Sequence, residues 1–192
     1  MIHNIVEPKA FQMYVGPFFW REKAKELKKS GDLLKLDLDR QWKYISNIDM
    51  DKGLDIIQLG PMLHDVCHAM YGFSLECLFK GYILHLHPEY SSNNKLYSKL
   101  KTHKLLKLAQ LAEFTLSNDE GLFCTNMTEI MEGYRYPVQS ESTGKDYFPS
   151  YSGDWYGLIF SLYERLDKEI KGYNIFGHDE ARCIKCLASK GS

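Results

Sequence analysis

The chain has 192 residues, 44% of them hydrophobic, which is enough for one domain with a sizeable core and an extension. Lysine and arginine number 24 against 25 acidic residues, and the net charge of -1 excludes a strong overall field toward nucleic acid or acidic membranes. Any site for a polyanion must therefore be a local patch.

Five cysteines form an odd and sparse set, which indicates reduced intracellular thiols rather than a disulfide framework. No apolar run approaches the roughly 20 residues of a membrane span. The first residues lack the basic start and apolar core of a secretory signal. We therefore expect a cytoplasmic protein with no membrane contact.

A first helix is expected to open at Gly16-Pro17, because proline is favoured in the first turn of a helix. Gly31 is expected to close this helix in a left-handed cap. Residues 33–55 are ambiguous, since leucines alternate there with charged residues as in a strand, while residues 40–48 also fit a short helix. The face that this first helix buries is formed by Trp20, Ala24 and Leu27.

The central element is predicted to be a helix that begins near Gly60-Pro61 and ends before Pro88, about 39 Å long at 1.5 Å per residue. It carries two apolar rows, on different sides. Such a helix is either surrounded by its own chain or shared between subunits, and we predict a homodimer with enclosure as the alternative. The rows are Leu63, Val66, Cys67, Met70, Phe73, Ser74, Cys77, Gly81 and Leu84, and Tyr71, Leu75, Leu78, Tyr82 and Leu86.

Three further helix starts are indicated after a polar connection over residues 88–101. Thr102 is a suitable N-cap, Ser117 and Glu120 match the capping box, and Asp154 is a suitable cap for a last long helix. Pro137 ends the middle helix and residues 138–153 read as a surface loop. The buried faces are expected at Leu105, Leu108, Ala109 and Ala112; at Phe123, Met127, Ile130, Met131 and Tyr134; and at Leu158, Ile159, Leu162, Leu166 and Ile170.

Three segments in this order resemble the HEPN family of small helical bundles, which bind nucleotides or RNA and some of which cut RNA. The segments are residues 74–84, residues 102–108 and the Tyr134-Arg135-Tyr136-Pro137 string. The resemblance implies an all-α, up-and-down bundle of four to five main helices over residues 60–172. Residues 1–59 are then an N-terminal helical extension that packs on the bundle, and residues 173–192 a peripheral tail.

Glu76 and Lys80 stand four residues apart in the order that favours a helix ion pair, worth about 0.3 kcal/mol. HEPN domains commonly carry this pair in the second helix, so the match supports the fold more than a chemistry. His103 corresponds to the histidine of the family's His-Asp-Leu segment, with Lys104 in place of the acid. A surface histidine is the alternative to a functional one.

Lysines near His103 form the best local patch for a polyanion, where an imidazole and free helix amides could hold a phosphate. A solvated lysine loop explains the same residues. The patch consists of Lys95, Lys99, Lys101, Lys104 and Lys107 together with His103.

Arg135 lies between Tyr134 and Tyr136, so its guanidinium could hold a phosphate while a tyrosine stacks on a base. An arginine that answers a helix dipole is the alternative. The Arg-Tyr-Pro string resembles the HEPN branch that accompanies minimal nucleotidyltransferases. In the RNA-cutting branch four to six residues separate the arginine from a histidine, whereas the corresponding residues 140–142 here are Ser-Glu-Ser. Cleavage would therefore need Arg135 to meet His103 or a partner's histidine.

Two metal motifs are weak. His64 and His68 resemble the zinc-peptidase pair with an aspartate in place of the glutamate, and Cys183 and Cys186 supply only part of a structural zinc site. The chain also lacks a glycine-rich phosphate loop and a Gly-x-Ser-x-Gly elbow, so we expect no metal and no cofactor.

The sequence therefore leaves three functions open. The first is a non-catalytic or weakly catalytic module that binds RNA or a nucleotide, in a defence or toxin-antitoxin system and with a nucleotidyltransferase partner. The second is a metal-independent ribonuclease that uses Arg135 and His103. The third is a structural dimerisation subunit without a ligand.

Overall fold

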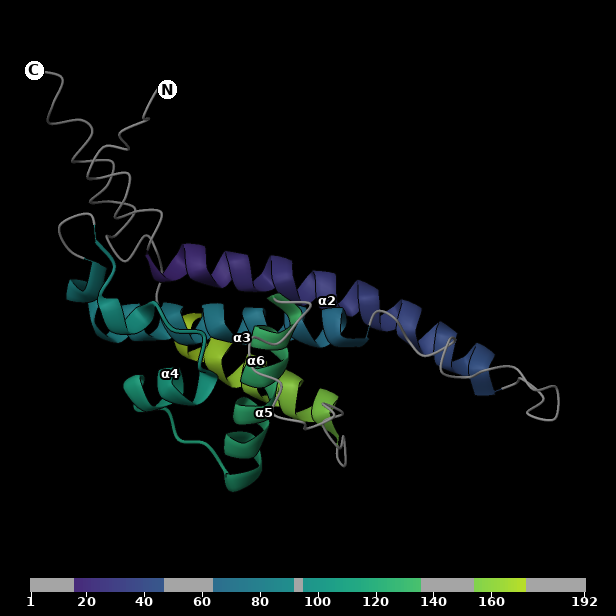
Figure 1. Ribbon diagram of the computed structural model, residues 1–192. Helices are drawn as coiled ribbons and strands as arrows, with labels where there is room; N and C mark the ends of the chain where they lie inside the picture. Colours follow the sequence, from purple (N-terminus) through teal and green to yellow (C-terminus); the bar gives the residue numbers. More distant parts are fainter. Residues whose placement is uncertain (1–15, 47–63, 92–94, 136–153, 172–192) are drawn as a thin grey trace, which may run out of the picture.

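The computed structural model describes residues 16–46, 64–91, 95–135 and 154–171 (Figure 1). All regular structure in these ranges is helical and none is strand, so the predicted all-α bundle is confirmed. No helix in the same ranges has the length and apolar character needed to cross a bilayer. The helices are α2 (Pro17–Ser46), α3 (His64–Leu86), η3 (Pro88–Ser91), η4 (Ser98–Leu100), α4 (Leu105–Leu111), α5 (Asn118–Arg135) and α6 (Trp155–Lys171).

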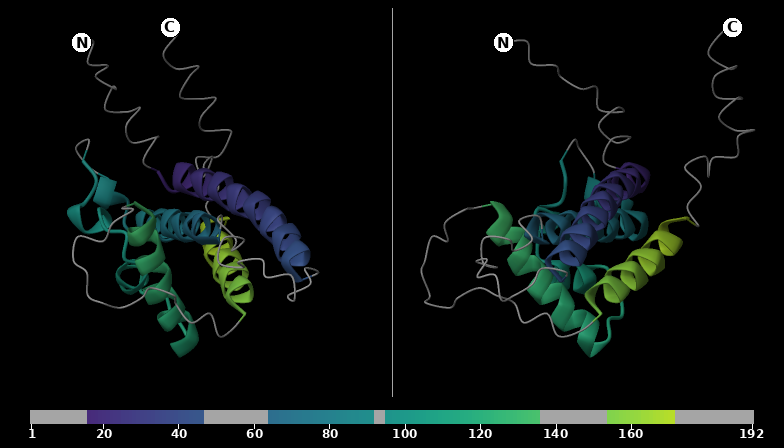
Figure 2. Two further views of the ribbon diagram at one scale, coloured as in Figure 1. Left: turned by 45° about the vertical axis from the view of Figure 1, so that its right-hand side comes forward. Right: turned by 90° about the vertical axis from the view of Figure 1, so that its right-hand side faces the viewer.

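Helix α3 is the central element, as predicted. Helix α2 runs along one side of α3, and α4, α5 and α6 pack on the remaining sides (Figures 1 and 2). Both apolar rows of α3 are largely buried by these neighbours. The enclosed alternative therefore applies to α3, and its two apolar sides do not require a second subunit. The homodimer stays a prediction.

The predicted end of the first helix at Gly31 is wrong, because α2 continues without a break from Pro17 to Ser46. Gly31 is a packing contact instead. A Cβ atom at this position would lie 2.9 Å from a ring carbon of Tyr71, and the Cys67 thiol donates to the Gly31 carbonyl at 3.4 Å. Glycine is needed here because α2 and the Tyr71 ring approach closely, and not because the chain turns.

The strand-like alternation after Leu33 is also helical as far as Ser46, and residues 47–55 lie outside the described ranges. The leucines separate by exposure: Leu38 is 1% exposed and packs in the core, whereas Leu36 is 56% exposed. The charged residues between them pair along the helix, with Lys35 Nζ 2.7 Å from an Asp39 carboxylate oxygen. A helix brings side chains four residues apart close together, whereas a strand does not, and this explains the pairs.

Thr102 does not cap α4, and that prediction is wrong by two residues. The helix begins at Leu105, and the Thr102 hydroxyl accepts a hydrogen bond from the Lys104 amide at 3.2 Å. The first amide of α4 is satisfied from another helix, because Leu105 N donates to Thr128 Oγ1 on α5 at 3.1 Å. Thr128 lies 23 residues from Leu105 in the sequence, so no local sequence pattern predicts this hydrogen bond.

The other two predicted caps are confirmed. Ser117 N donates to Glu120 Oε2 at 2.8 Å and Glu120 N donates to Ser117 Oγ at 3.2 Å, the reciprocal bonds of a capping box. On α6, Gly157 N donates to Asp154 Oδ1 at 2.8 Å. Arg165 of α6 adds a further bond to Glu120, so the start of α5 is tied to α6.

Candidate functional site

Glu76 on α3 joins two basic side chains. Lys80 Nζ donates to Glu76 Oε1 at 2.7 Å, and His103 Nδ1 lies 3.0 Å from Oε1 and 2.9 Å from Oε2. The side chains of Lys80 and Glu76 are only 5% and 8% exposed, whereas that of His103 is 38% exposed. His103 is therefore the member of this cluster that a ligand can reach directly, and Glu76 and Lys80 can only position it.

Helix α2 covers the inner part of the cluster. Trp20 of α2 places its ring 5.3 Å from Lys80 Nζ, which is a cation–π contact. The Lys80 ammonium thus has a carboxylate and an aromatic face as partners, which compensate for its removal from water. Sequence reasoning missed Trp20 as part of this site. Its position in the apolar face of the first helix indicated only core packing.

The backbone around His103 is fixed from both sides. Leu100 and Leu105 are fully buried, and the Leu105 amide is bonded to Thr128 on α5. The contact with Glu76 adds a third constraint on the imidazole itself. His103 is therefore held in one orientation at the surface, although it lies in a connection between helices.

The lysines near His103 are exposed, and no acid of the described residues pairs with them. Residues 95–107 contain five lysines and no acid, which makes a formal charge of +5 with histidine neutral, in a chain of net charge -1. None of the five forms an ion pair within the described residues, whereas Lys23, Lys25 and Lys28 of α2 each pair with an acid of the same helix. The lysine segment, as we name residues 95–107, is thus a local concentration of positive charge that no described acid pairs.

A stack of aromatic rings precedes and enters the lysine segment. The His87 and Tyr90 ring centroids are 4.7 Å apart, and those of Tyr90 and Tyr97 are 4.4 Å apart. Sequence reasoning treated this stretch as a polar connection and missed these residues. The sequence offered no clear signal, since residues 88–100 hold only Tyr90 and Tyr97 as aromatic residues, and the pairing of these rings depends on two short 3-10 helices that were not predicted.

The Arg135 group is the part of the predicted site that lies outside the described geometry. Arg135 is the last residue of α5, seven residues after Thr128. The side chains of Tyr134 and Arg135 and the whole of Tyr136 fall outside the described structure. An approach of Arg135 to His103 therefore stays a prediction.

The His64 and His68 pair lies at the start of α3, with ring centroids 4.3 Å apart. His68 is buried against Trp155 and Tyr156 of α6, at centroid distances of 6.0 Å and 5.4 Å. Among the described residues, no three His, Cys, Asp or Glu side chains are arranged to hold a metal ion. Cys183 and Cys186 lie outside those residues.

Protonation of His68 is expected to make stability depend on pH. Burial lowers the pKa of His68 from 6.5 to about 4, so between these values the unfolded chain binds a proton that the folded chain does not. The free energy of unfolding should therefore fall by up to about 3 kcal/mol as the pH drops from 6.5 to 4. Urea unfolding at pH 7, 5.5 and 4.5 measures this loss.

The matched variant is His68→Phe, which keeps an aromatic ring beside Trp155 but has no titratable group. Its loss of stability over the same pH interval should be smaller by most of that amount. An equal loss in the variant and in the wild type would assign the pH dependence to other groups.

A polar hollow of about 370 Å³ lies beside α6, and His103 is not among the residues that line it. Its charged side chains are of both signs, and Arg165 is already bonded to Glu120 and to the Thr115 carbonyl. This balance of charge does not favour an anionic ligand. The hollow is lined by Tyr82, Glu113, Phe114, Thr115, Arg165, Lys168 and Glu169.

Comparison with known proteins gives no match. No family model fits the chain, and neither a curated protein nor a solved structure is detectably similar to it. The resemblance to HEPN domains therefore stays a prediction. The function proposed below is argued from the geometry around His103 together with that resemblance.

Proposed function

We propose that this chain is a HEPN-like module that binds RNA or a nucleotide through the lysine segment and His103. The observation that carries the proposal is the charge of the segment, +5 formally and without an ion pair among the described residues. Phosphate groups are the ligands that such lysines recognise, and their counterions are released on binding. His103 lies within the segment and is presented at the surface in a fixed orientation.

In this proposal Glu76 and Lys80 act through His103. Their side chains are nearly buried, so they contact no phosphate themselves. Glu76 holds the imidazole by Nδ1, and Lys80 balances the charge of the carboxylate. We propose a non-catalytic or weakly catalytic module, because residues 140–142 lack the histidine that the RNA-cutting branch of the family carries after its arginine.

Removing three lysines of the segment is expected to weaken RNA binding. We expect the variant Lys101→Gln/Lys104→Gln/Lys107→Gln to bind labelled single-stranded RNA at least about tenfold more weakly at low salt, since three phosphate contacts are lost. The slope of log affinity against log salt concentration should fall by about 2. Fluorescence anisotropy over a salt series measures both quantities.

The control is Lys23→Gln/Lys25→Gln/Lys29→Gln, which removes the same charge from α2. It should bind almost as tightly as the wild type, and circular dichroism should show both variants equally folded. Equal losses in the two variants would mean that only the overall charge matters. If wild-type protein binds neither RNA nor nucleotides, the proposal fails and the structural dimerisation subunit remains.

A metal-independent ribonuclease is the second candidate, favoured by the bond between Glu76 and His103. A carboxylate that orients one ring nitrogen of a histidine is the arrangement found in general base catalysis. Cleavage of labelled RNA that survives a chelator, and that disappears in both His103→Ala and Arg135→Ala, would establish this activity. Intact RNA after incubation with wild-type protein would leave binding alone.

Four further predictions stay untested: the homodimer rests on the two apolar rows of the central helix, the location on the cysteines and the absence of a signal or span in the sequence, and the other two on the family resemblance. They are a homodimer, a nucleotidyltransferase partner, a role in a defence or toxin-antitoxin system and a cytoplasmic location. The molar mass of the purified protein, measured by light scattering, tests the first of these directly. A monomer at micromolar concentration would contradict it.

A further inference from the structure

Three aromatic rings form a continuous stack at one end of the bundle. His87 and Tyr90 are almost parallel, with an interplanar angle of 16°, and Tyr90 and Tyr97 are tilted by 33°. Lys99 Nζ lies 5.8 Å from the Tyr97 ring centroid. We call His87, Tyr90 and Tyr97 the ring column.

Backbone hydrogen bonds hold the ring column in place. His87 N donates to the Ile83 carbonyl at 2.8 Å, and Tyr90 N donates to the His87 carbonyl at 3.0 Å. Tyr97 N donates to the Tyr90 carbonyl at 2.7 Å, which joins the two sides of the connection. The rings are therefore positioned by the fold before any ligand arrives.

The ring column is only partly buried. All three residues retain intermediate exposure, whereas Tyr71 and Phe79 of the core are fully buried. Among the described aromatic residues, His87 makes ring contact only with Tyr90, so it ends the column. Contact with the core explains why the inner edges of these rings are buried. It does not explain why the rings stack on one another as far as the surface.

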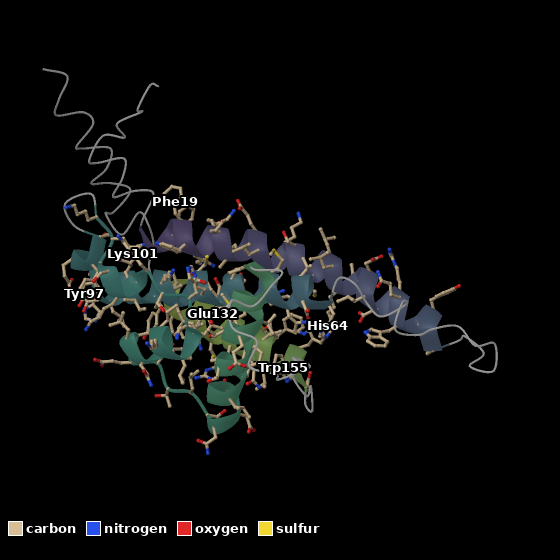
Figure 3. All side chains as sticks on the ribbon, viewed as in Figure 1. Phe19, His64, Tyr97, Lys101, Glu132 and Trp155 are labelled. Atoms are coloured by element: carbon tan, nitrogen blue, oxygen red, sulfur yellow. The ribbon has the colours of Figure 1, made fainter. Side chains whose placement is uncertain are left out.

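The lysine segment begins at the same end of the molecule. Tyr97 belongs to the segment, and Figure 3 shows Tyr97 and Lys101 close to that end. Lys95, Lys99 and Lys101 are all exposed. Single-stranded nucleic acid is bound by this combination of aromatic faces and cations, in which bases stack on rings while phosphates contact lysines.

We propose that the ring column is a stacking platform for the bases of single-stranded RNA, with flanking phosphates on Lys99 and Lys101. This inference rests on the function proposed above and narrows its ligand. The internal bases of a duplex are already stacked on their neighbours, so a duplex offers the column only its terminal base pairs. A free phosphate or a pyrophosphate uses only the lysines.

The experiment compares Tyr97→Leu with Tyr97→Phe, which keeps the ring. We expect Tyr97→Leu to bind a short single-stranded RNA about tenfold or more weakly, because one base loses its stacking partner. Tyr97→Phe should stay close to the wild type. The slope of log affinity against log salt should be unchanged in both, since no phosphate contact is removed.

A measurement on the wild-type protein gives the same answer without a variant. Oligonucleotides that carry 2-aminopurine at successive positions should lose fluorescence on binding where the base stacks on the column. An abasic oligonucleotide of the same length should bind about tenfold more weakly than one with bases.

The outcomes separate the two proposals. RNA binding with no fluorescence change, with equal affinity for the abasic chain or with equal affinity for a duplex overturns the platform and leaves the lysine segment as a phosphate site. Loss of binding in the lysine variant together with quenching in the wild type supports both. If the wild type binds nucleotides but no RNA, only the platform fails, and if it binds neither, both proposals fail.

Discussion

Glu76→Ala is expected to lower the free energy of unfolding by about 3–5 kcal/mol, because it leaves the Lys80 ammonium buried without its carboxylate. The Lys80 side chain is only 5% exposed, so water replaces the lost partner poorly. His103 loses its contact in the same variant. Chemical denaturation at pH 7 measures the loss.

Two further variants make this result specific. Glu22→Ala removes an acid from an exposed pair with Lys25 on α2 and should cost less than about 1 kcal/mol. Glu76→Leu/Lys80→Met removes both charges and should recover most of the stability, since apolar side chains of similar size can replace a buried pair. If Glu76→Ala costs no more than Glu22→Ala, the pair is not buried in solution.

The double variant also separates stability from function. It should fold about as well as the wild type, yet His103 is no longer held by a carboxylate. If RNA binding falls in this variant while its folding is unchanged, Glu76 is a positioning residue for His103. Unchanged binding would restrict the role of Glu76 to the fold.

Tyr71→Ala is expected to cost about 3–5 kcal/mol, the usual range for removing a large aromatic side chain from a core. Tyr71 is fully buried on α3 and packs edge-on against Tyr156 and Phe160 of α6. Its loss leaves a cavity between α2, α3 and α6. Thermal and urea unfolding give the size of the effect.

Tyr71→Phe is the matched control, because it keeps the ring and removes only the hydroxyl that donates to Asp32 Oδ1 at 2.8 Å. We expect a cost of about 1 kcal/mol for this single hydrogen bond. Gly31→Ala should be destabilising in the wild type but much less so beside Tyr71→Ala, since the added methyl group collides with the Tyr71 ring. Equal costs in the two backgrounds would contradict the close approach.

The parts of the fold that the sequence predicts correctly are those with a local cause. The capping box of Ser117 and Glu120 and the cap at Asp154 depend on side chains three residues from the amides they satisfy. The central position of α3 follows from two apolar rows in one helix. Each of these patterns is complete within a few turns of chain.

The errors concern contacts between distant segments. Gly31 matches a helix end as well as a packing contact, and only the position of the Tyr71 ring decides between them. Thr102 matches an N-cap, but Thr128 supplies the bond at the start of α4. In both cases the deciding partner lies at least 23 residues away.

In the candidate site too, the local contact is predicted from the sequence and the long-range contact is not. The pairing of Glu76 with Lys80 follows from their spacing of four and is confirmed. The link from Glu76 to His103 spans 27 residues and has no periodic signal, although the resemblance to HEPN domains singled out all three. Glu76 and Lys80 are buried because α2 covers this part of α3. Burial prevents the two side chains from contacting a ligand directly and leaves them to support His103.

The Glu120 carboxylate has two structural roles, because it accepts hydrogen bonds from both Ser117 N and Arg165. It completes the first turn of α5 and also holds α6, whose Arg165 reaches the Thr115 carbonyl at 2.7 Å as well. The ends of helices ordinarily fray and exchange their amide hydrogens early. Here the first turn of α5 should exchange only when α6 detaches, so that the two helices open as one cooperative unit.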